Sequence, residues 1–220
     1  MSERPTVWRA ILESQWKWTR GLALLGALVG FALPLLSLRT ALATQSTASF
    51  IATMQAWGVG YAIAAAALGL MTAIAAWGYD HRLRHVYALS LPLARWRYVL
   101  LRFCAGLVML ALPVVAVFIA SEIVAHSSMV PKVLQAYPVA LTLRFGFATL
   151  VAYSLFFAIS SATGRTAGYI LGGIALIIVA QVVISSANLQ VDLVSRSIDL
   201  VFAAPGLLAV FGGRWTLIDV

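Results

Sequence analysis

Long apolar runs constrain this chain more than any other feature of its sequence. Of its 220 residues, 62% are hydrophobic and 10% are charged, whereas a soluble domain has about a quarter charged residues. This number of charged side chains is too small to cover a surface that faces water. We therefore expect a lipid bilayer to surround most of the chain. Because backbone groups in lipid must bond within the chain, we predict transmembrane helices. The unbroken runs lack the alternation of a β-barrel.

Five apolar runs approach or exceed the length of a membrane span, which needs about 20 residues. We predict spans at 21–38, 50–79, 98–121, 141–163 and 167–187. Pro34 and Pro113 are expected to kink the first and third spans. We therefore expect an all-α, polytopic membrane protein that forms one transmembrane domain over residues 1–220.

An amphipathic helix is predicted before the first span, at residues 5–20. Its aromatic and basic side chains, Trp8, Trp16 and Lys17, are typical of a helix that lies in the lipid headgroup layer. A cytosolic tail with topogenic charges is the alternative.

A second amphipathic segment follows the fifth span. Residues 190–202 place apolar side chains at helical spacing, and 203–213 are broken by Pro205 and Gly206 and are too short to cross a bilayer. We predict that 190–213 is amphipathic and re-entrant, with a shortened sixth crossing as the alternative.

The basic residues predict the orientation. With a cytoplasmic N-terminus, ten lysines and arginines lie inside and five lie outside, as the positive-inside rule requires. We expect a multi-pass protein of the cytoplasmic (inner) membrane. The net charge of +8 is interpreted as topology and contact with membrane lipids, and no nucleic-acid partner is expected.

The sequence does not contain the motifs of an enzyme. It has no His-Glu-x-x-His, no Gly-x-Ser-x-Gly and no phosphate-binding loop. The lone Cys104 is expected to be inert, and His126 is expected to pair weakly with Glu122. We predict no catalytic residue, metal or cofactor. Polar residues in the spans, such as Thr149 and Ser161, are expected to bond between helices.

Glycines recur at helical spacing in two places. Gly26 and Gly30 form one pair, and Gly164, Gly168 and Gly172 form a longer stripe. Such faces allow two helices to approach closely. These glycine faces are consistent both with packing between helices of one chain and with a dimer interface.

The charged stretch 80–97 interrupts the apolar pattern between the second and third spans. Pro92 disfavours helical geometry at Leu91, which predicts a helix–break–helix elbow on the cytoplasmic side. Its tip exposes Val86, Leu89 and Leu91 among arginines. Such an apolar tip fits a groove on a soluble partner, and a topogenic loop that contacts lipid phosphates is equally consistent with the spacing.

The segment "HVYALSLPLARWRYVLLRF" resembles the export-type permeases of ATP-binding-cassette transporters. The features that carry the likeness are the basic residues before it, Leu89-Ser90-Leu91-Pro92 and Arg95. The amphipathic 5–20 and the fourth and fifth spans are similar too, so the resemblance covers most of 1–187. The family has six spans, and this chain departs from it in the region 190–213.

The resemblance implies a permease that pairs with a second, identical or homologous permease and rests on separate cytosolic ATPase subunits. The elbow would then be the coupling helix, with the ATPase contacts His85, Val86, Leu89, Leu91, Pro92 and Arg95. An amphipathic or lipid-like substrate would be exported by alternating access. A non-transport scaffold subunit of a larger membrane complex is the rival expectation.

Overall fold

A computed structural model describes residues 7–44, 46–82, 94–127, 134–161 and 208–219, apart from isolated positions between 169 and 206. The chain divides into two compact units. One comprises residues 1–157 and 214–220, and the other comprises residues 158–213.

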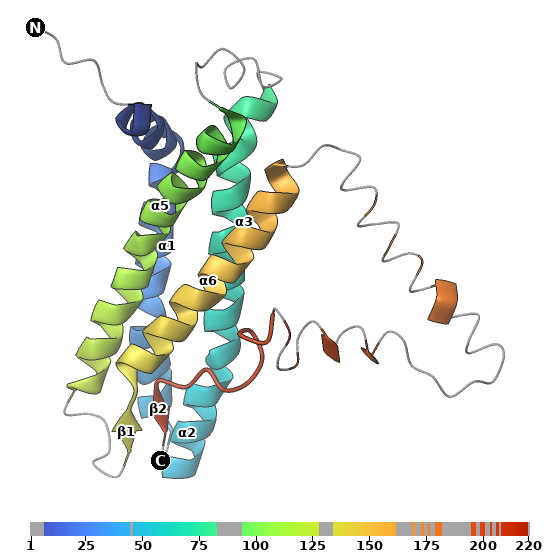
Figure 1. Cartoon of the computed structure of the whole chain (residues 1–220). Helices are drawn as coiled ribbons and strands as arrows, with labels where there is room; N and C mark the ends of the chain where they lie inside the picture. The colour runs from blue at the N-terminus through green and yellow to red at the C-terminus, as the bar shows by residue number, and fades with distance from the viewer. Residues whose placement is uncertain are drawn as a thin grey trace, which may run out of the picture. The chain divides into compact units, whose positions relative to one another are not determined.

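Four long helices lie alongside one another in the first unit (Figure 1). They are α1 (Val7–Leu42), α3 (Gly58–Arg82), α5 (Arg95–Ala125) and α6 (Pro138–Ser161). A short helix, α2 (Thr47–Ala56), precedes α3, and two strands, β1 (Gln135–Ala136) and β2 (Ile218–Asp219), pair antiparallel. The described chain is therefore all-α apart from this short ladder.

Four segments are long and apolar enough to cross a membrane in the described part of the chain. They are Trp8–Leu42, Thr47–Gly78, Arg95–Ala125 and Pro138–Ser161. They correspond to the first four predicted spans and support a multi-pass membrane architecture by their length and hydropathy. Apart from isolated positions, the predicted fifth span at 167–187 and most of the segment 190–213 lie outside the described residues. Within the latter, Phe211 N–H donates to the Leu208 carbonyl at 2.9 Å in a tight turn.

The first helix extends four residues beyond the predicted end of the first span. α1 has 36 residues, about 54 Å at 1.5 Å per residue, so it exceeds a hydrocarbon core of about 30 Å. The predicted interfacial helix 5–20 and the predicted span 21–38 join in one helix that is continuous from Val7. Figure 1 shows its first turns, in dark blue, nearly end-on and at an angle to the rest.

The interval 39–49 between the first two predicted spans is largely helical in the structure. α1 continues to Leu42, where the Thr40 hydroxyl donates to the Leu36 carbonyl at 3.0 Å. The next helix begins at Thr47 because Ser46 caps it, with the Ser49 amide donating to the Ser46 hydroxyl at 3.2 Å.

The second span is broken at Trp57, which the sequence did not predict. Trp57 forms a turn between α2 and α3, and its indole Nε1 donates to the Thr40 hydroxyl of the α1 end at 2.7 Å. Directly after it, a Cβ on Gly58 would lie 3.0 Å from the backbone oxygen of Trp215. The break thus coincides with a close approach of the C-terminal segment.

Small residues allow the long helices to approach one another closely. A Cβ on Gly26 would meet Leu68 of α3, and one on Gly30 would lie 3.0 Å from the Pro113 carbonyl oxygen of α5. The Gly26–Gly30 face therefore packs within the chain, the first of the two alternatives that the sequence left open. Pro113, buried inside α5, lies at this crossing.

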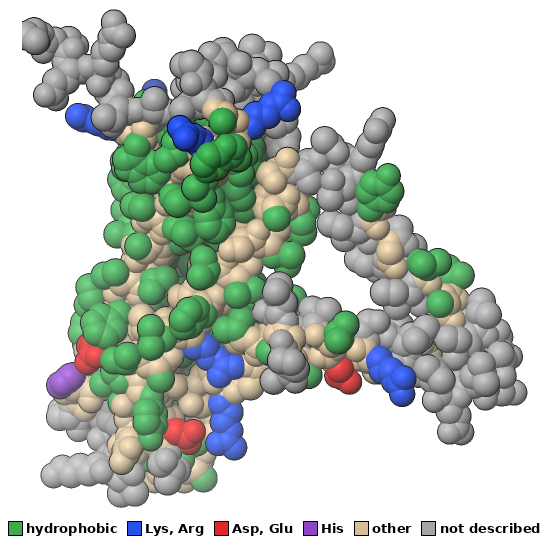
Figure 2. Space-filling view, in the orientation of Figure 1, with side chains coloured by type: hydrophobic (Ala, Val, Ile, Leu, Met, Phe, Trp, Pro, Cys, Tyr) green, Lys and Arg blue, Asp and Glu red, His purple; other side chains and the backbone are tan. Residues whose placement is uncertain are grey.

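The outer surface of the helices is apolar. Leu28, Ile63 and Phe147 expose more than half of their surface, and Figure 2 shows hydrophobic side chains along the length of the helices. Basic side chains gather toward the ends of the helices in the same view. A surface of this kind suits lipid.

Polar side chains in the spans bond mainly to their own helix, contrary to the prediction. Thr149 donates to the Phe145 carbonyl and Ser161 to the Ala158 carbonyl, both at 2.8 Å. Ser and Thr hydroxyls reach the backbone three or four residues earlier, so they need no partner on another helix. An interhelical bond does join Tyr153 of α6, whose hydroxyl donates to the Phe103 carbonyl at 3.2 Å.

Candidate functional site

The predicted coupling elbow lies between the end of α3 and the start of α5. Of its six predicted contact residues, five lie outside the described part of the chain: His85, Val86, Leu89, Leu91 and Pro92. The sixth, Arg95, is exposed in the first turn of α5. Its helix begins after Ala94, whose extended backbone has φ −62° and ψ 135°. Pro92, on which the predicted break depends, lies outside the described residues.

A buried arginine joins α3 and α5 close to the elbow. Arg102 is 8% exposed and lies about 10 Å along α5 from Arg95 at 1.5 Å per residue. Its Nε donates to the Ala76 carbonyl of α3 at 2.5 Å, and its Nη1 donates to the Tyr98 hydroxyl. Its guanidinium carbon lies 5.6 Å from the centre of the Trp77 ring. We call this arrangement the Arg102 clamp.

The clamp compensates a charge in an apolar setting. A buried cation is costly unless it is hydrogen-bonded or paired. Here the guanidinium has a backbone carbonyl, a hydroxyl and the faces of Trp77 and Tyr98 as partners, and aromatic faces attract cations. The arrangement ties two helices together and fixes the Arg102 side chain in one place.

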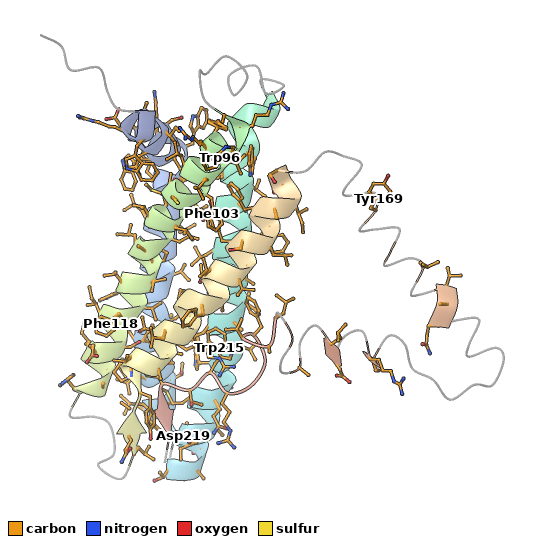
Figure 3. The ribbon with its side chains drawn as sticks, viewed as in Figure 1. Trp96, Phe103, Phe118, Tyr169, Trp215 and Asp219 are labelled. Carbon is orange, nitrogen blue, oxygen red and sulfur yellow. The ribbon has the colours of Figure 1, made fainter. Side chains whose placement is uncertain are left out.

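An aromatic cluster connects the clamp to α6. The Trp77 and Phe157 rings lie 5.2 Å apart, and Phe103 lies 5.1 Å from Tyr153 and 5.2 Å from Phe157. Figure 3 shows Phe103 on the upper part of α5, below Trp96. Three helices, α3, α5 and α6, therefore meet through packed rings two turns from the elbow.

The predicted interfacial residues lie on the exposed side of the first turns of α1. Trp8 and Trp16 are 36% and 43% exposed, and Lys17 is exposed too. The opposite stripe, Ile11, Gln15 and Thr19, is buried. The two tryptophans are thus exposed, and their placement in a headgroup layer stays a prediction.

The end of the first unit away from the elbow carries a folded C-terminal segment. Gln135 pairs with Asp219 and Ala136 with Ile218, and the Tyr137 amide donates to the Leu217 carbonyl at 2.8 Å. The anchoring side chains, Trp215, Leu217 and Ile218, are at most 4% exposed. Figure 3 shows Trp215 and Asp219 at the lower end of the helices, near α2.

Arg144 of α6 lies against this C-terminal segment. Its guanidinium carbon is 5.1 Å from the centre of the Trp215 ring, and its Nη1 donates to the Arg214 carbonyl at 2.5 Å. Arg214 Nη1 is 3.8 Å from an Asp219 carboxylate oxygen. A cavity of about 330 Å³ opens beside these four residues.

Three further predictions concern the Glu122–His126 pair, a metal site and the glycine stripe at 164–172. His126 lies 3.5 Å from the Glu122 carboxylate, which confirms the predicted pair. No group of three or more potential metal ligands exists among the residues that the structure describes. Gly164, Gly168 and Gly172 lie outside those residues, so their packing role stays a prediction.

Sequence reasoning missed Arg102, Arg144 and Trp215 as site residues. Arg102 was interpreted as a topogenic charge, although Tyr98 four residues earlier was a usable signal for a partner on the same helix face. The pairing of 135–137 with 217–219 joins segments about 80 residues apart, and a two-residue strand leaves no periodic pattern.

The comparisons with known proteins identify no relative. No protein-family model, no curated protein and no solved structure matches this chain. By length and hydropathy, the described part of the chain is that of a four-helix membrane protein.

Proposed function

We propose that this chain is the membrane permease subunit of an ATP-driven exporter. Separate ATP-binding-cassette ATPase subunits would dock on the cytoplasmic elbow 80–97. The sequence likeness at Leu89-Ser90-Leu91-Pro92 and Arg95 motivates the proposal. The observation that supports it best is the Arg102 clamp, which joins α3 and α5, the two helices on either side of the elbow.

The clamp suits a part that receives force. Ala76 lies six residues before the end of α3, and Arg102 lies seven residues after the start of α5. A force applied to the elbow would therefore move α3 and α5 together rather than separate them. Such a rigid pair of helices is needed if the closure of a soluble ATPase is to be transmitted to the membrane-spanning helices.

The aromatic cluster offers a path for that motion. Through Trp77–Phe157 and Phe103–Tyr153, displacement of α3 and α5 would reach α6. Through the close approach of Gly30 to Pro113, it would reach α1. Packed cores switch between discrete arrangements more readily than they deform continuously, so the helices would rearrange together in alternating access.

The other parts of the proposal follow from the same arrangement. The exposed Trp8 and Trp16 would hold the first turns of α1 in the headgroup layer. A second permease, identical or homologous, would complete the pathway. The substrate is proposed to be amphipathic or lipid-like, because the described spans offer mainly apolar side chains and hydroxyls bonded to their own helix.

Copurification from the native membrane tests the proposal. The tagged full chain should retain an ATP-binding-cassette ATPase, and Leu89→Asp and Arg95→Glu should each lose most of it. Arg39→Glu, at the far end of α1, is the matched control and should retain it. An ATPase that remains bound to both elbow variants would refute the coupling role, and a complex without any ATPase would favour the scaffold.

A further inference from the structure

The cavity beside Arg144 has the features of a small binding site. Its volume of about 330 Å³ is at the lower end of the range of small-molecule sites, about 300–1,000 Å³. Tyr137 and Leu141 line it from the start of α6, and Arg214 and Asp219 line it from the C-terminal segment. Residues far apart in the sequence thus form one concave surface.

Positive charge dominates this cavity. Among the described residues that line it, the charged groups are the guanidinium groups of Arg144 and Arg214 and the carboxylate of Asp219. The Arg214–Asp219 contact is loose at 3.8 Å, and the Arg214 side chain is 80% exposed. Exposed pairs of this kind are weak, so Arg214 can turn toward an anion at little cost.

The Arg144 guanidinium is held in place before any ligand arrives. It stacks on Trp215 and donates to the Arg214 carbonyl, and Trp215 is itself buried. A fixed guanidinium offers its N–H groups as a planar fork, which matches the oxygens of a phosphate. A preorganised donor loses little side-chain entropy on binding.

The position of the cavity favours a ligand from the membrane surface. Arg144 lies about 9 Å along α6 from its first residue, Pro138, at 1.5 Å per residue. The aromatic side chains Tyr137 and Trp215 are typical of the interface between lipid and water. Figure 2 shows basic side chains beside an acidic one at this end of the helices.

We propose that this cavity binds a phosphate group, supplied by a lipid headgroup or by free phosphate. Arg144 and Arg214 bind its oxygens, and Asp219 weakens the binding by repulsion. The site does not depend on the proposed exporter function, because it lies at the end of the helices away from the elbow.

Titration of the purified full chain in a phosphate-free maltoside detergent tests the proposal. The two probes are dihexanoyl phosphatidic acid and inorganic phosphate, and isothermal calorimetry measures the dissociation constant. Loss of a charge-assisted bond in Arg214→Gln should weaken binding about tenfold, and Asp219→Asn should strengthen it. Arg39→Gln removes the same charge at the end of α1 outside the cavity and should leave it unchanged.

The two probes distinguish the sources of the phosphate. Binding of the lipid alone identifies a headgroup site, and equal binding of inorganic phosphate identifies a site for the free anion; both support the proposal if Arg214→Gln weakens them. Since the Arg214 side chain is exposed, its loss should leave the thermal unfolding midpoint unchanged. The proposal is overturned if neither probe binds, or if Arg214→Gln binds them as tightly as Arg39→Gln does.

Discussion

Gly69 of α3 lies directly against the backbone of Tyr153 in α6. A Cβ on residue 69 would come within 2.6 Å of the Tyr153 amide nitrogen and 2.9 Å of the Thr149 carbonyl oxygen. Neither backbone atom can move aside without shifting α6. This contact therefore sets the distance between α3 and α6.

Gly69→Ala should destabilise the protein although alanine is the better helix former. Helix propensity alone favours alanine over glycine by about 1 kcal/mol, but overpacking costs about 1–3 kcal/mol or more. We expect a lower midpoint of thermal unfolding in detergent. Gly78→Ala is the matched control, since no atom lies within 4 Å of its added Cβ, and it should be neutral or stabilising. Equal effects of the two changes would contradict the close packing.

Arg102→Ala should lower the free energy of unfolding more than alanine substitution of an exposed arginine in the same helix does. Hydrogen bonds to a charged group contribute about 1.5–3 kcal/mol, and the packing against Trp77 is lost too. Arg97, which is exposed and stacks on Trp96, is the control, because surface changes usually lie within about 0.5 kcal/mol. Reversible unfolding in detergent with added denaturant measures both.

Lysine should not replace Arg102 fully. A lysine ammonium is a point charge and lacks the planar fork that reaches the Ala76 carbonyl and the Tyr98 hydroxyl together. Arg102→Lys should therefore have a free energy of unfolding between those of the parent and Arg102→Ala. Full recovery with lysine would mean that charge alone, without directed bonds, stabilises the site.

Trp215→Ala should loosen the C-terminal segment. Trp215 is 4% exposed and contacts both Gly58 and Arg144, and truncation of a buried tryptophan costs about 3–5 kcal/mol. Amide exchange at residues 135–137 and 215–219 should speed up by at least tenfold. Trp96→Ala, at a 64% exposed position, should leave exchange there unchanged. Protection that survives in Trp215→Ala would show that the strand pair does not need this anchor.

The sequence predicted the helices well because their determinants are local. Apolar length located the first four spans, and the Glu122–His126 spacing predicted the contact between these two side chains. Each of these signals lies within a few residues of the structure that it determines.

The parts that the sequence missed depend on distant partners. Trp57 breaks the second span where Gly58 meets Trp215, about 157 residues further along the chain, and nothing near Trp57 signals this. An arginine at the end of an apolar run, such as Arg102, looks the same whether it faces phosphate or a buried carbonyl. Only the tertiary packing distinguishes the two.

Side-specific cysteine labelling tests the central claim, that the elbow between α3 and α5 faces the cytosol. In a Cys104→Ser background, Ser90→Cys places a thiol on the elbow and Ser46→Cys places one before α2. An impermeant maleimide should label Ser90→Cys only in inside-out vesicles and Ser46→Cys only in intact cells. Labelling of Ser90→Cys in intact cells, with Ser46→Cys protected there, would contradict the account.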